Sequence, residues 1–368
     1  MLVVWTARNG ACAKTVGVDE LKNLLISAVT SHRSDQDTAR KLTTLTLSER
    51  ITGDTFTTLL AEIPGPLTAT ALEDLMIQSA FLDPPETERG SAAAPSPTEQ
   101  KAIFGRTEVY AAEYVKRLPN LICTELIVRF DDNSLREAKG MRSVGKMRFL
   151  DTLSSEVTRV NGAESVHLLT VNGKPHTGSL LLGATTGGEF GNTIVSLMDQ
   201  SSQFKTGWSH WEMLRGQQIA VFYYSVALAN SKYVLSFGCG SGTPRSLTAA
   251  YDGFLFIEPA SGAIVRITRK AVGLPADFPT RQTDTAIDYG PVSIANHSYL
   301  LPIRSATVAD NPLACDFGKE RIHSLNEIHF SDYRLFEAES KLLFSGDPAK
   351  QTPSSNSKPK PEPGPPPQ

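Results

Sequence analysis

A long series of short strand-like segments, separated by turn-forming pairs, constrains this chain more than any other feature. Between residues 121 and 344, runs of β-branched and aromatic residues are repeatedly broken by Asn-Gly, Asp-Gly and Gly-Pro pairs. Such runs predict strands, and the pairs between them predict tight turns. The pattern predicts roughly ten or more strands, most of them joined by short connections, and hence a mainly antiparallel meander. A sheet of this size curls as it grows.

The clearest hairpin lies within residues 251–270. Its two apolar runs, at residues 254–257 and 264–267, flank the turn sequence Pro-Ala-Ser-Gly at residues 259–262. Two apolar runs around a short turn that contains glycine are typical of antiparallel strands. The sequence also predicts a tight turn at Asn161-Gly162, a break between strands at Gly290-Pro291 and a turn at Asn296-His297.

A helical pattern precedes the strands. Apolar residues recur at a spacing of three to four, as at Leu21 and Leu25, and Ser34 with Asp37 resembles a capping box. Residues 14–82 are therefore predicted to form a small helical module. Its apolar stripes form the core of the module or, alternatively, a face for a protein partner.

The remaining boundaries follow from composition. The small and proline-rich residues at 83–97 predict a flexible linker. Residues 98–346 are predicted to form the β domain, which begins with a helix over residues 98–118. Residues 347–368 end in KPKPEPGPPPQ and predict a disordered, polyproline-like tail. The predicted fold class is α+β: a curled antiparallel half-barrel preceded by a small helical module.

The first 13 residues bear on the cellular compartment. Ala11-Cys12-Ala13 fits the small-residue pattern at which signal peptides are cleaved. One interpretation is a secretory signal truncated by a late start codon, which places the protein in the periplasm or outside the cell. The other is the ordinary N-terminus of a cytoplasmic protein. A lipid-modified Cys12 is a third interpretation, although Asn9 stands where an aliphatic residue is expected.

Charge and hydropathy argue against two classes of partner. The chain has 36 Lys and Arg residues against 39 Asp and Glu residues, a formal net charge of -3. Nucleic-acid-binding proteins normally need a basic surface to neutralise phosphates. No apolar run approaches the ~20 residues that cross a bilayer as a helix. We therefore expect no nucleic-acid partner and no transmembrane segment.

No motif for catalysis, a cofactor or a metal stands out. The glycine-rich segment at residues 238–242 follows a strand and resembles a nucleophile elbow, but Cys239 replaces a required glycine and no helix follows. No histidine pair has the i, i+4 spacing of a helical zinc site. We therefore expect no enzyme, no cofactor and no metal. If the protein were a hydrolase, Ser241, His210 and Glu327 would be the first candidates for its site.

The four cysteines have no C-x-x-C spacing. Cys123 lies in an apolar run and is expected to be a small buried side chain. Cys239 and Cys315 lie in predicted loops, and they can form a disulfide only if the fold brings their Cα atoms within about 7 Å.

The order of these elements resembles the lipoprotein-carrier superfamily, which includes LolA-like carriers and RseB-type sensors of envelope stress. The resemblance covers about residues 100–345 and begins with a helix that runs directly into the strand at residues 121–130. It continues with the hairpin around Glu258-Pro259 and Ser261-Gly262. The segments at residues 285–292 and 299–302, and those at 326–328 and 332–334, are similar to secreted bacterial proteins of this type.

The resemblance implies a half-barrel whose concave, apolar face takes an acyl chain or a lipidated protein. Alternate side chains of the strands at residues 221–224 and 254–257 are expected to line such a cavity. The candidate ligand-binding residues are Trp208, Trp211, Phe222, Tyr224, Phe254 and Phe256.

Three functions are therefore compatible with the sequence. The first is an envelope binding module for a lipid, an acyl chain or a lipidated protein. The second is a sensor or scaffold that recognises a protein through its sheet edge or its helical module and has no small ligand. The third, a secreted hydrolase, has the least support because no catalytic motif is intact.

Overall fold

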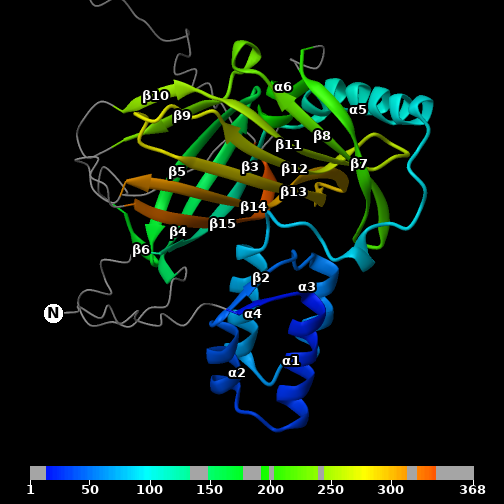
Figure 1. Cartoon of the computed structure of the whole chain (residues 1–368). Helices are drawn as coiled ribbons and strands as arrows, with labels where there is room; N and C mark the ends of the chain where they lie inside the picture. The colour runs from blue at the N-terminus through cyan, green and yellow to red at the C-terminus, as the bar shows by residue number, and fades with distance from the viewer. Residues whose placement is uncertain are drawn as a thin grey trace, which may run out of the picture. The chain divides into compact units, whose positions relative to one another are not determined.

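The computed structural model describes residues 14–132, 148–176, 192–198, 203–238, 244–312 and 321–336, and Figure 1 shows their elements. An eleven-stranded sheet dominates this part of the chain. Its strands are β3 (Leu121–Asp131), β4 (Arg148–Val160), β5 (Ala163–Val171), β6 (Lys174–Pro175), β7 (Lys205–Leu214), β8 (Gln217–Val226), β11 (Ala250–Ile257), β12 (Ile264–Val272), β13 (Gln282–Ile294), β14 (His297–Pro312) and β15 (Arg321–Leu335). Their order is β6-β5-β4-β3-β15-β14-β13-β12-β11-β8-β7.

The predicted antiparallel meander is confirmed, since every pairing in this sheet is antiparallel. Neighbours in the sheet follow one another along the chain except where β3 pairs with β15 and β11 pairs with β8. Six of these pairings contain a shift in register, for example between Asp288 and Tyr289 in β13. Such bulges bend strands and increase their twist, so the sheet curls into an open half-barrel.

Three of the predicted turns differ from those expected, and one of them, at Asp252-Gly253, lies inside the continuous strand β11. The sequence predicts a break at Gly290-Pro291, but β13 runs through it, and Pro291 lies opposite Leu300 of β14. The turn to β14 is made by Ala295 and Asn296, whose φ angles are 48° and 65°. Two consecutive positive φ angles are typical of a two-residue hairpin turn, which places this turn one residue earlier than predicted.

The N-terminal segment is helical, as predicted. Its helices are α1 (Val18–Thr30), α2 (Asp35–Leu42), α3 (Gly53–Leu60) and α4 (Pro66–Gln78). Leu21, Leu25 and Leu72 are fully buried in a core that belongs to this segment. The predicted cap is present, because Ser34 accepts a hydrogen bond from Asp37 N at 3.1 Å. The sequence analysis missed the short parallel pair β1 (Lys14–Val16) and β2 (Leu45–Leu47).

Residues 83–97, predicted to be a linker, contain the short 3-10 helix Glu86–Glu88 and contact the sheet. Gly90 N donates a hydrogen bond to Trp211 O at 2.9 Å. The indole Nε1 of Trp211 in turn donates to Ala93 O at 2.9 Å. The edge strand β7 is therefore partly covered by this segment.

The helix predicted before the first strand is α5 (Pro97–Arg117), cyan in Figure 1. It packs on the sheet together with α6 (Asn192–Met198), and their side chains share the main hydrophobic core with the strands. Phe104 of α5 packs edge-to-face on Phe222 of β8, with the ring centroids 5.9 Å apart. A separate two-stranded sheet is formed by β9 (Val234–Phe237) and β10 (Arg245–Thr248), and Leu228–Asn230 forms a 3-10 turn.

The turn between β11 and β12 contacts the backbone of α5 at Gly262. This residue has a φ of 77°, and a Cβ atom added to it would lie 2.4 Å from the backbone carbon of Arg106. Only glycine satisfies both the left-handed conformation and this close approach. A second contact supports the arrangement, because Arg106 Nε donates to Pro259 O at 2.8 Å.

Gly262→Ala is therefore expected to lower the free energy of unfolding more than the same substitution at a glycine whose surroundings leave room for a Cβ atom. Gly173 is the matched control, since its φ is 72° but no atom lies within 4 Å of an added Cβ. Both variants place alanine at a positive φ angle and carry the resulting backbone strain. In Gly262→Ala the new methyl group also collides with the backbone of α5, which lowers the free energy of unfolding by about a further 1–3 kcal/mol. Urea unfolding measures the difference, and equal losses in the two variants would contradict a tight contact with α5.

Candidate functional site

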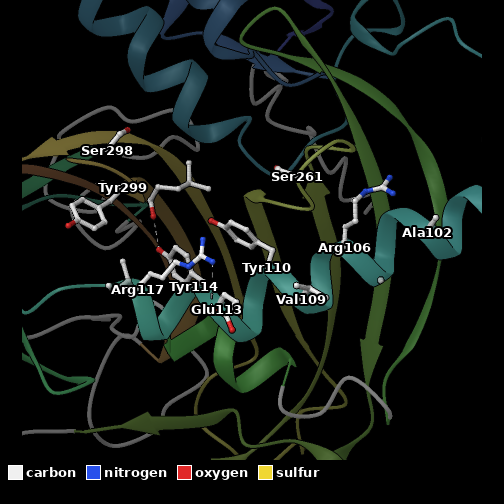
Figure 2. Close-up of a pocket in the computed structure, with 13 residues that line it drawn as sticks. Ala102, Arg106, Val109, Tyr110, Glu113, Tyr114, Arg117, Ser261, Ser298 and Tyr299 are labelled. Carbon is white, nitrogen blue, oxygen red and sulfur yellow. Dashed lines mark hydrogen bonds and ion pairs between the residues drawn. The ribbon is translucent and has the colours of Figure 1, made fainter. Parts of the chain in front are cut away.

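A groove of about 770 Å³ lies along α5, between that helix, the β11–β12 turn and the start of β14 (Figure 2). Most of its surface is apolar. The residues that line it are Ala102, Gly105, Arg106, Val109, Tyr110, Glu113, Tyr114, Arg117, Leu118, Ser261, Ser298, Tyr299 and Leu300. The volume falls in the range of pockets that hold small organic ligands.

The α5 side of the groove is open because of its small residues. Ala102, Gly105 and Val109 follow one another at a spacing of three to four, so they share one face of the helix. A Cβ atom added to Gly105 would have no atom within 4 Å. Val109 is apolar, yet 67% of its surface is exposed. This face of α5 therefore offers open apolar surface to a ligand.

Two tyrosines of α5 line the groove. Tyr110 and Tyr114 project from α5 on the side of Ser261 and Tyr299 (Figure 2), and their ring centroids lie 5.6 Å apart. The hydroxyl of Tyr114 donates to Leu300 O at 2.8 Å. Burial raises the pKa of both tyrosines, so neither hydroxyl ionises near neutral pH. We interpret these side chains as apolar walls and not as acid–base groups.

Charged groups flank this aromatic surface. Arg106 and Arg117 lie on α5 on either side of Tyr110 (Figure 2). Arg117 is largely exposed and lies 3.7 Å from Glu113. The groove thus combines an apolar floor with guanidinium groups at its rim, which suits a ligand with an apolar chain and an anionic group.

Four of the six predicted ligand-binding residues lie together, beneath α5. Phe222 and Tyr224 of β8 are buried in the main core, and Trp208 and Trp211 of β7 pack against that core. The ring centroids of Trp208 and Phe222 are 5.5 Å apart. A shift in register between Trp208 and His210 places the two tryptophans on the same side of the sheet although they are three residues apart.

The other two predicted residues, Phe254 and Phe256, lie on the opposite face of the sheet. Phe256 is buried in a separate cluster with Ile219 and Val221 and does not join Phe222. Leu255, which pairs with Phe222, is the residue of β11 that reaches the main core. All four residues at 254–257 are apolar, so their alternation did not reveal which of them face α5.

None of the six predicted residues is among those that line the groove as the structure describes it. The sequence analysis predicted the helix over residues 98–118 but assigned none of its residues to a ligand site. One feature of the sequence could have indicated the groove. Ala102, Gly105 and Val109 are small or apolar, although a solvent-facing side of a helix normally carries polar side chains.

The face of the sheet opposite α5 carries buried ion pairs. Arg50 pairs with Glu212 of β7, and their side chains are 8% and 0% exposed. Arg266 Nη1 lies 2.7 Å from Asp288 Oδ1. The guanidinium carbons of Arg50 and Arg266 lie 5.7 and 5.6 Å from the centroid of the Phe256 ring. The four charged residues of these pairs help to line a cavity of about 230 Å³.

The two carboxylates of these pairs have lowered pKa values. Burial alone raises the pKa of Glu212, but the hydrogen bond with His210 and the charges of Arg50 and Arg266 outweigh it. Burial also raises the pKa of Asp288, but the charge and hydrogen bond of Arg266, together with the charges of Arg304 and Arg215, outweigh it. A carboxylate whose folded pKa lies below its unfolded value of about 4 adds stability that is complete above that value. This stability is lost as the pH falls through the folded pKa.

Asp288→Asn should therefore make the free energy of unfolding depend less on pH in the acidic range. We expect the free energy of unfolding of the natural chain to decrease as the pH falls below about 4.5. The variant is expected to be less stable at pH 7, because Arg266 loses its partner, and to lose less stability on acidification. Urea unfolding at several pH values between 7 and 3 measures both quantities. Identical slopes in the two proteins would contradict this role of Asp288.

The hydrolase candidates have structural partners. His210 Nε2 lies 3.4 Å from Glu212 Oε2, and its Nδ1 lies 2.9 Å from the Ser209 hydroxyl. Glu327 contacts Arg304 at 2.5 Å. Ser241 lies outside the described residues.

The cysteines and the membrane prediction are tested only within the described part of the chain. Cys123 is free and buried, as predicted, and burial raises the pKa of its thiol to about 12. The other cysteines, Cys12, Cys239 and Cys315, lie outside the described residues.

Among the helices that the structure describes, none has the length and apolar character needed to cross a bilayer.

Comparisons with known proteins find similarity only among solved structures: no family model and no curated protein matches. A LolA superfamily protein from Nitrosomonas europaea is 10% identical, with coverage of 65% of this chain and 94% of its own and a TM-score of 0.30. An outer membrane lipoprotein-sorting protein domain from Vibrio parahaemolyticus is 10% identical, with coverage of 64% and 92% and a TM-score of 0.29. A DUF1329 family protein from Desulfovibrio piger is 9% identical, with coverage of 64% and 92% and a TM-score of 0.30.

These TM-scores are low, so the fold class rests on the order and curl of the strands themselves. The chain is an α+β protein with a curled antiparallel half-barrel, and its predicted resemblance to the lipoprotein-carrier superfamily is confirmed as a loose structural likeness.

Proposed function

We propose that the sheet domain is a binding module of the cell envelope that holds an acyl chain, of a lipid or of a lipidated protein, in the groove along α5. The observation that carries this proposal is the groove itself, about 770 Å³ in volume and mostly apolar. A soluble protein rarely leaves open apolar surface without a use for it. The location, periplasmic or secreted, is part of the proposal and follows from the family resemblance.

The proposal assigns distinct roles to the apolar and the charged side chains that α5 contributes to the groove. Val109 and Tyr110 contact the chain of the ligand, and Arg106 and Arg117 at the rim attract its anionic group. An acyl chain gains about 0.8 kcal/mol for each CH₂ group that it buries, so even part of a chain yields useful affinity.

We propose that the four aromatic residues beneath α5 act indirectly. Phe222 and Tyr224 of β8 and Trp208 and Trp211 of β7 support the inner side of the helix, through contacts such as that between Phe104 and Phe222. Phe254 and Phe256 lie on the other face of the sheet and are not part of the proposed site.

A fluorescent fatty-acid probe tests the proposal. We expect saturable binding with one probe per chain and displacement by unlabelled fatty acid or phospholipid. Absence of saturable binding would contradict the acyl-chain function and favour the alternative, recognition of a protein without a small ligand. A pull-down with and without residues 14–82 would then show whether the helical module carries the protein contact.

A further inference from the structure

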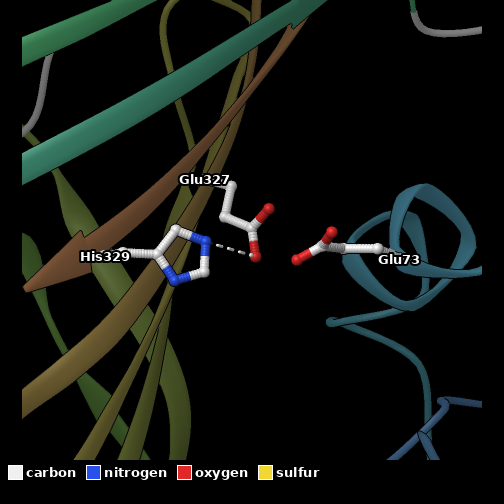
Figure 3. Close-up of side chains that lie close together, drawn as sticks. All are labelled: Glu73, Glu327 and His329. Carbon is white, nitrogen blue, oxygen red and sulfur yellow. Dashed lines mark ion pairs between the residues drawn. The ribbon is translucent and has the colours of Figure 1, made fainter. Parts of the chain in front are cut away.

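Three metal-ligating side chains meet between α4 and β15 (Figure 3). Glu73 belongs to α4, and Glu327 and His329 belong to β15. One potential ligand atom from each residue lies within 4.8 Å of the others. Glu327 and His329 are two residues apart in a strand, so their side chains project from the same face of the sheet.

The carboxylate of Glu327 is buried, and its Oε1 atom has ion-pair contacts but accepts no hydrogen bond within the part of the chain that the structure describes. Its side chain is 3% exposed, with His329 Nε2 at 3.1 Å and Arg304 Nη2 at 2.5 Å from Oε1. Both contacts are ion pairs, and among the described residues no hydrogen bond reaches the enclosed Oε1 atom. A buried carboxylate oxygen that accepts no hydrogen bond can still bind a further positively charged group.

The carboxylate of Glu73 adds negative charge beside Glu327, at which it points in Figure 3. Two carboxylates in one site repel each other unless a proton or a cation lies between them. Arg304 supplies one positive charge for the two negative charges. A divalent cation at the point where the three side chains meet removes the repulsion.

The His329–Glu327 contact and the ligand types fit a particular class of cation. Ligand atoms bound to zinc at 2.0–2.2 Å lie roughly 3.0–3.5 Å from one another, and the His329–Glu327 contact of 3.1 Å falls in that range. One imidazole and two carboxylates suit Zn²⁺ and similar transition-metal ions, whereas Mg²⁺ and Ca²⁺ prefer oxygen ligands alone. Arg304 would then be an outer partner of a ligating carboxylate, an arrangement common around bound metals.

We propose that Glu73, Glu327 and His329 bind a divalent transition-metal ion of the Zn²⁺ class, which ties α4 to β15. This inference is independent of acyl-chain binding, since the three residues do not line the groove along α5. It replaces the expectation from sequence that no metal is bound. Sequence spacing did not reveal the site because Glu73 is far from the other two residues along the chain.

Isothermal titration calorimetry with zinc chloride, on the full chain after treatment with a chelator, tests the site. We expect one zinc ion per chain. Glu73→Gln and His329→Ala should each weaken binding more than about tenfold, a loss that even a mutation in the outer shell of a metal site produces. Because Glu73 is exposed, Glu73→Gln is expected to leave the fold intact.

His323→Ala is the matched control. His323 lies on the same strand, and its ring contacts Asp132 at 2.8 Å and Asp310 at 3.9 Å. Zinc affinity should be unchanged in this variant. Zinc should also raise the Tm of the natural chain and of His323→Ala, but not that of Glu73→Gln. The proposal would be overturned if the natural chain bound no zinc, if Glu73→Gln and His329→Ala bound it normally, or if only His323→Ala lost it.

Discussion

Glu212→Gln is expected to lower the free energy of unfolding by about 3–5 kcal/mol. The carboxylate of Glu212 is fully buried, and it compensates the charge of Arg50, whose side chain is only 8% exposed. Glutamine has nearly the same shape but no charge, so the variant leaves an unpaired guanidinium in the interior. Burial and the nearby charge of Arg266 lower the pKa of Arg50, whereas the charge and hydrogen bond of Glu212 raise it, so Glu212 stabilises the charged guanidinium.

Glu156→Gln provides the matched control for an exposed ion pair. Glu156 lies 2.9 Å from Arg334, and the two side chains are 40% and 54% exposed. Solvent screens such a pair, so its loss should cost at most about 1 kcal/mol. Urea unfolding of both variants measures the contrast, and similar small losses would show that the Arg50–Glu212 pair is well solvated.

The double variant Arg50→Met, Glu212→Leu tests whether the stability loss in Glu212→Gln comes from the uncompensated charge of Arg50. Replacing both charges with apolar side chains of similar size leaves no uncompensated charge. We expect it to recover most of the stability that Glu212→Gln loses. A double variant less stable than Glu212→Gln would indicate that the two residues do not act as a pair.

Gly105→Trp is expected to lower the affinity for an acyl-chain probe by at least about tenfold, because the indole would fill the groove where a bound chain would lie. The side chain would begin in open space, since an added Cβ atom at Gly105 meets no atom within 4 Å. The substitution also places a better helix former inside α5, so the fold should be retained.

Gly105→Ala separates the effect on the helix from the effect on the groove. Alanine removes the cost of a glycine inside a helix, about 1 kcal/mol, and adds only one methyl group. This variant should be slightly more stable than the natural chain and should bind the probe with nearly unchanged affinity. If both variants lost binding equally, or if Gly105→Trp bound normally, the groove along α5 would not be the acyl site.

Local patterns in the sequence were sufficient to predict the architecture. The hairpin of β11 and β12 follows from two apolar runs around Gly262, and the Ser34 cap follows from its spacing to Asp37. Turn residues and alternating runs act through neighbours along the chain, so they can be read without the tertiary structure. β13 continues through Gly290-Pro291 because its pairing with β14 outweighs the local turn signal.

The candidate site depended on contacts that the sequence does not contain. Residues 254–257 are all apolar, so only the register with β8 shows that Leu255, and not Phe254 or Phe256, reaches the main core. The groove arises because the turn at Ser261 and the strand at Tyr299 lie beside α5. These segments are far apart along the chain, and no periodicity connects them.

Native mass spectrometry of the natural chain and of Gly105→Trp, purified side by side without detergent from the cells that make them, tests the central claim most directly. We predict that the natural chain carries one lipid-sized adduct per molecule, that solvent extraction removes it, and that Gly105→Trp carries none. A natural chain with no adduct, or equal adducts on the two proteins, would contradict the account of the groove along α5 as an acyl-chain site.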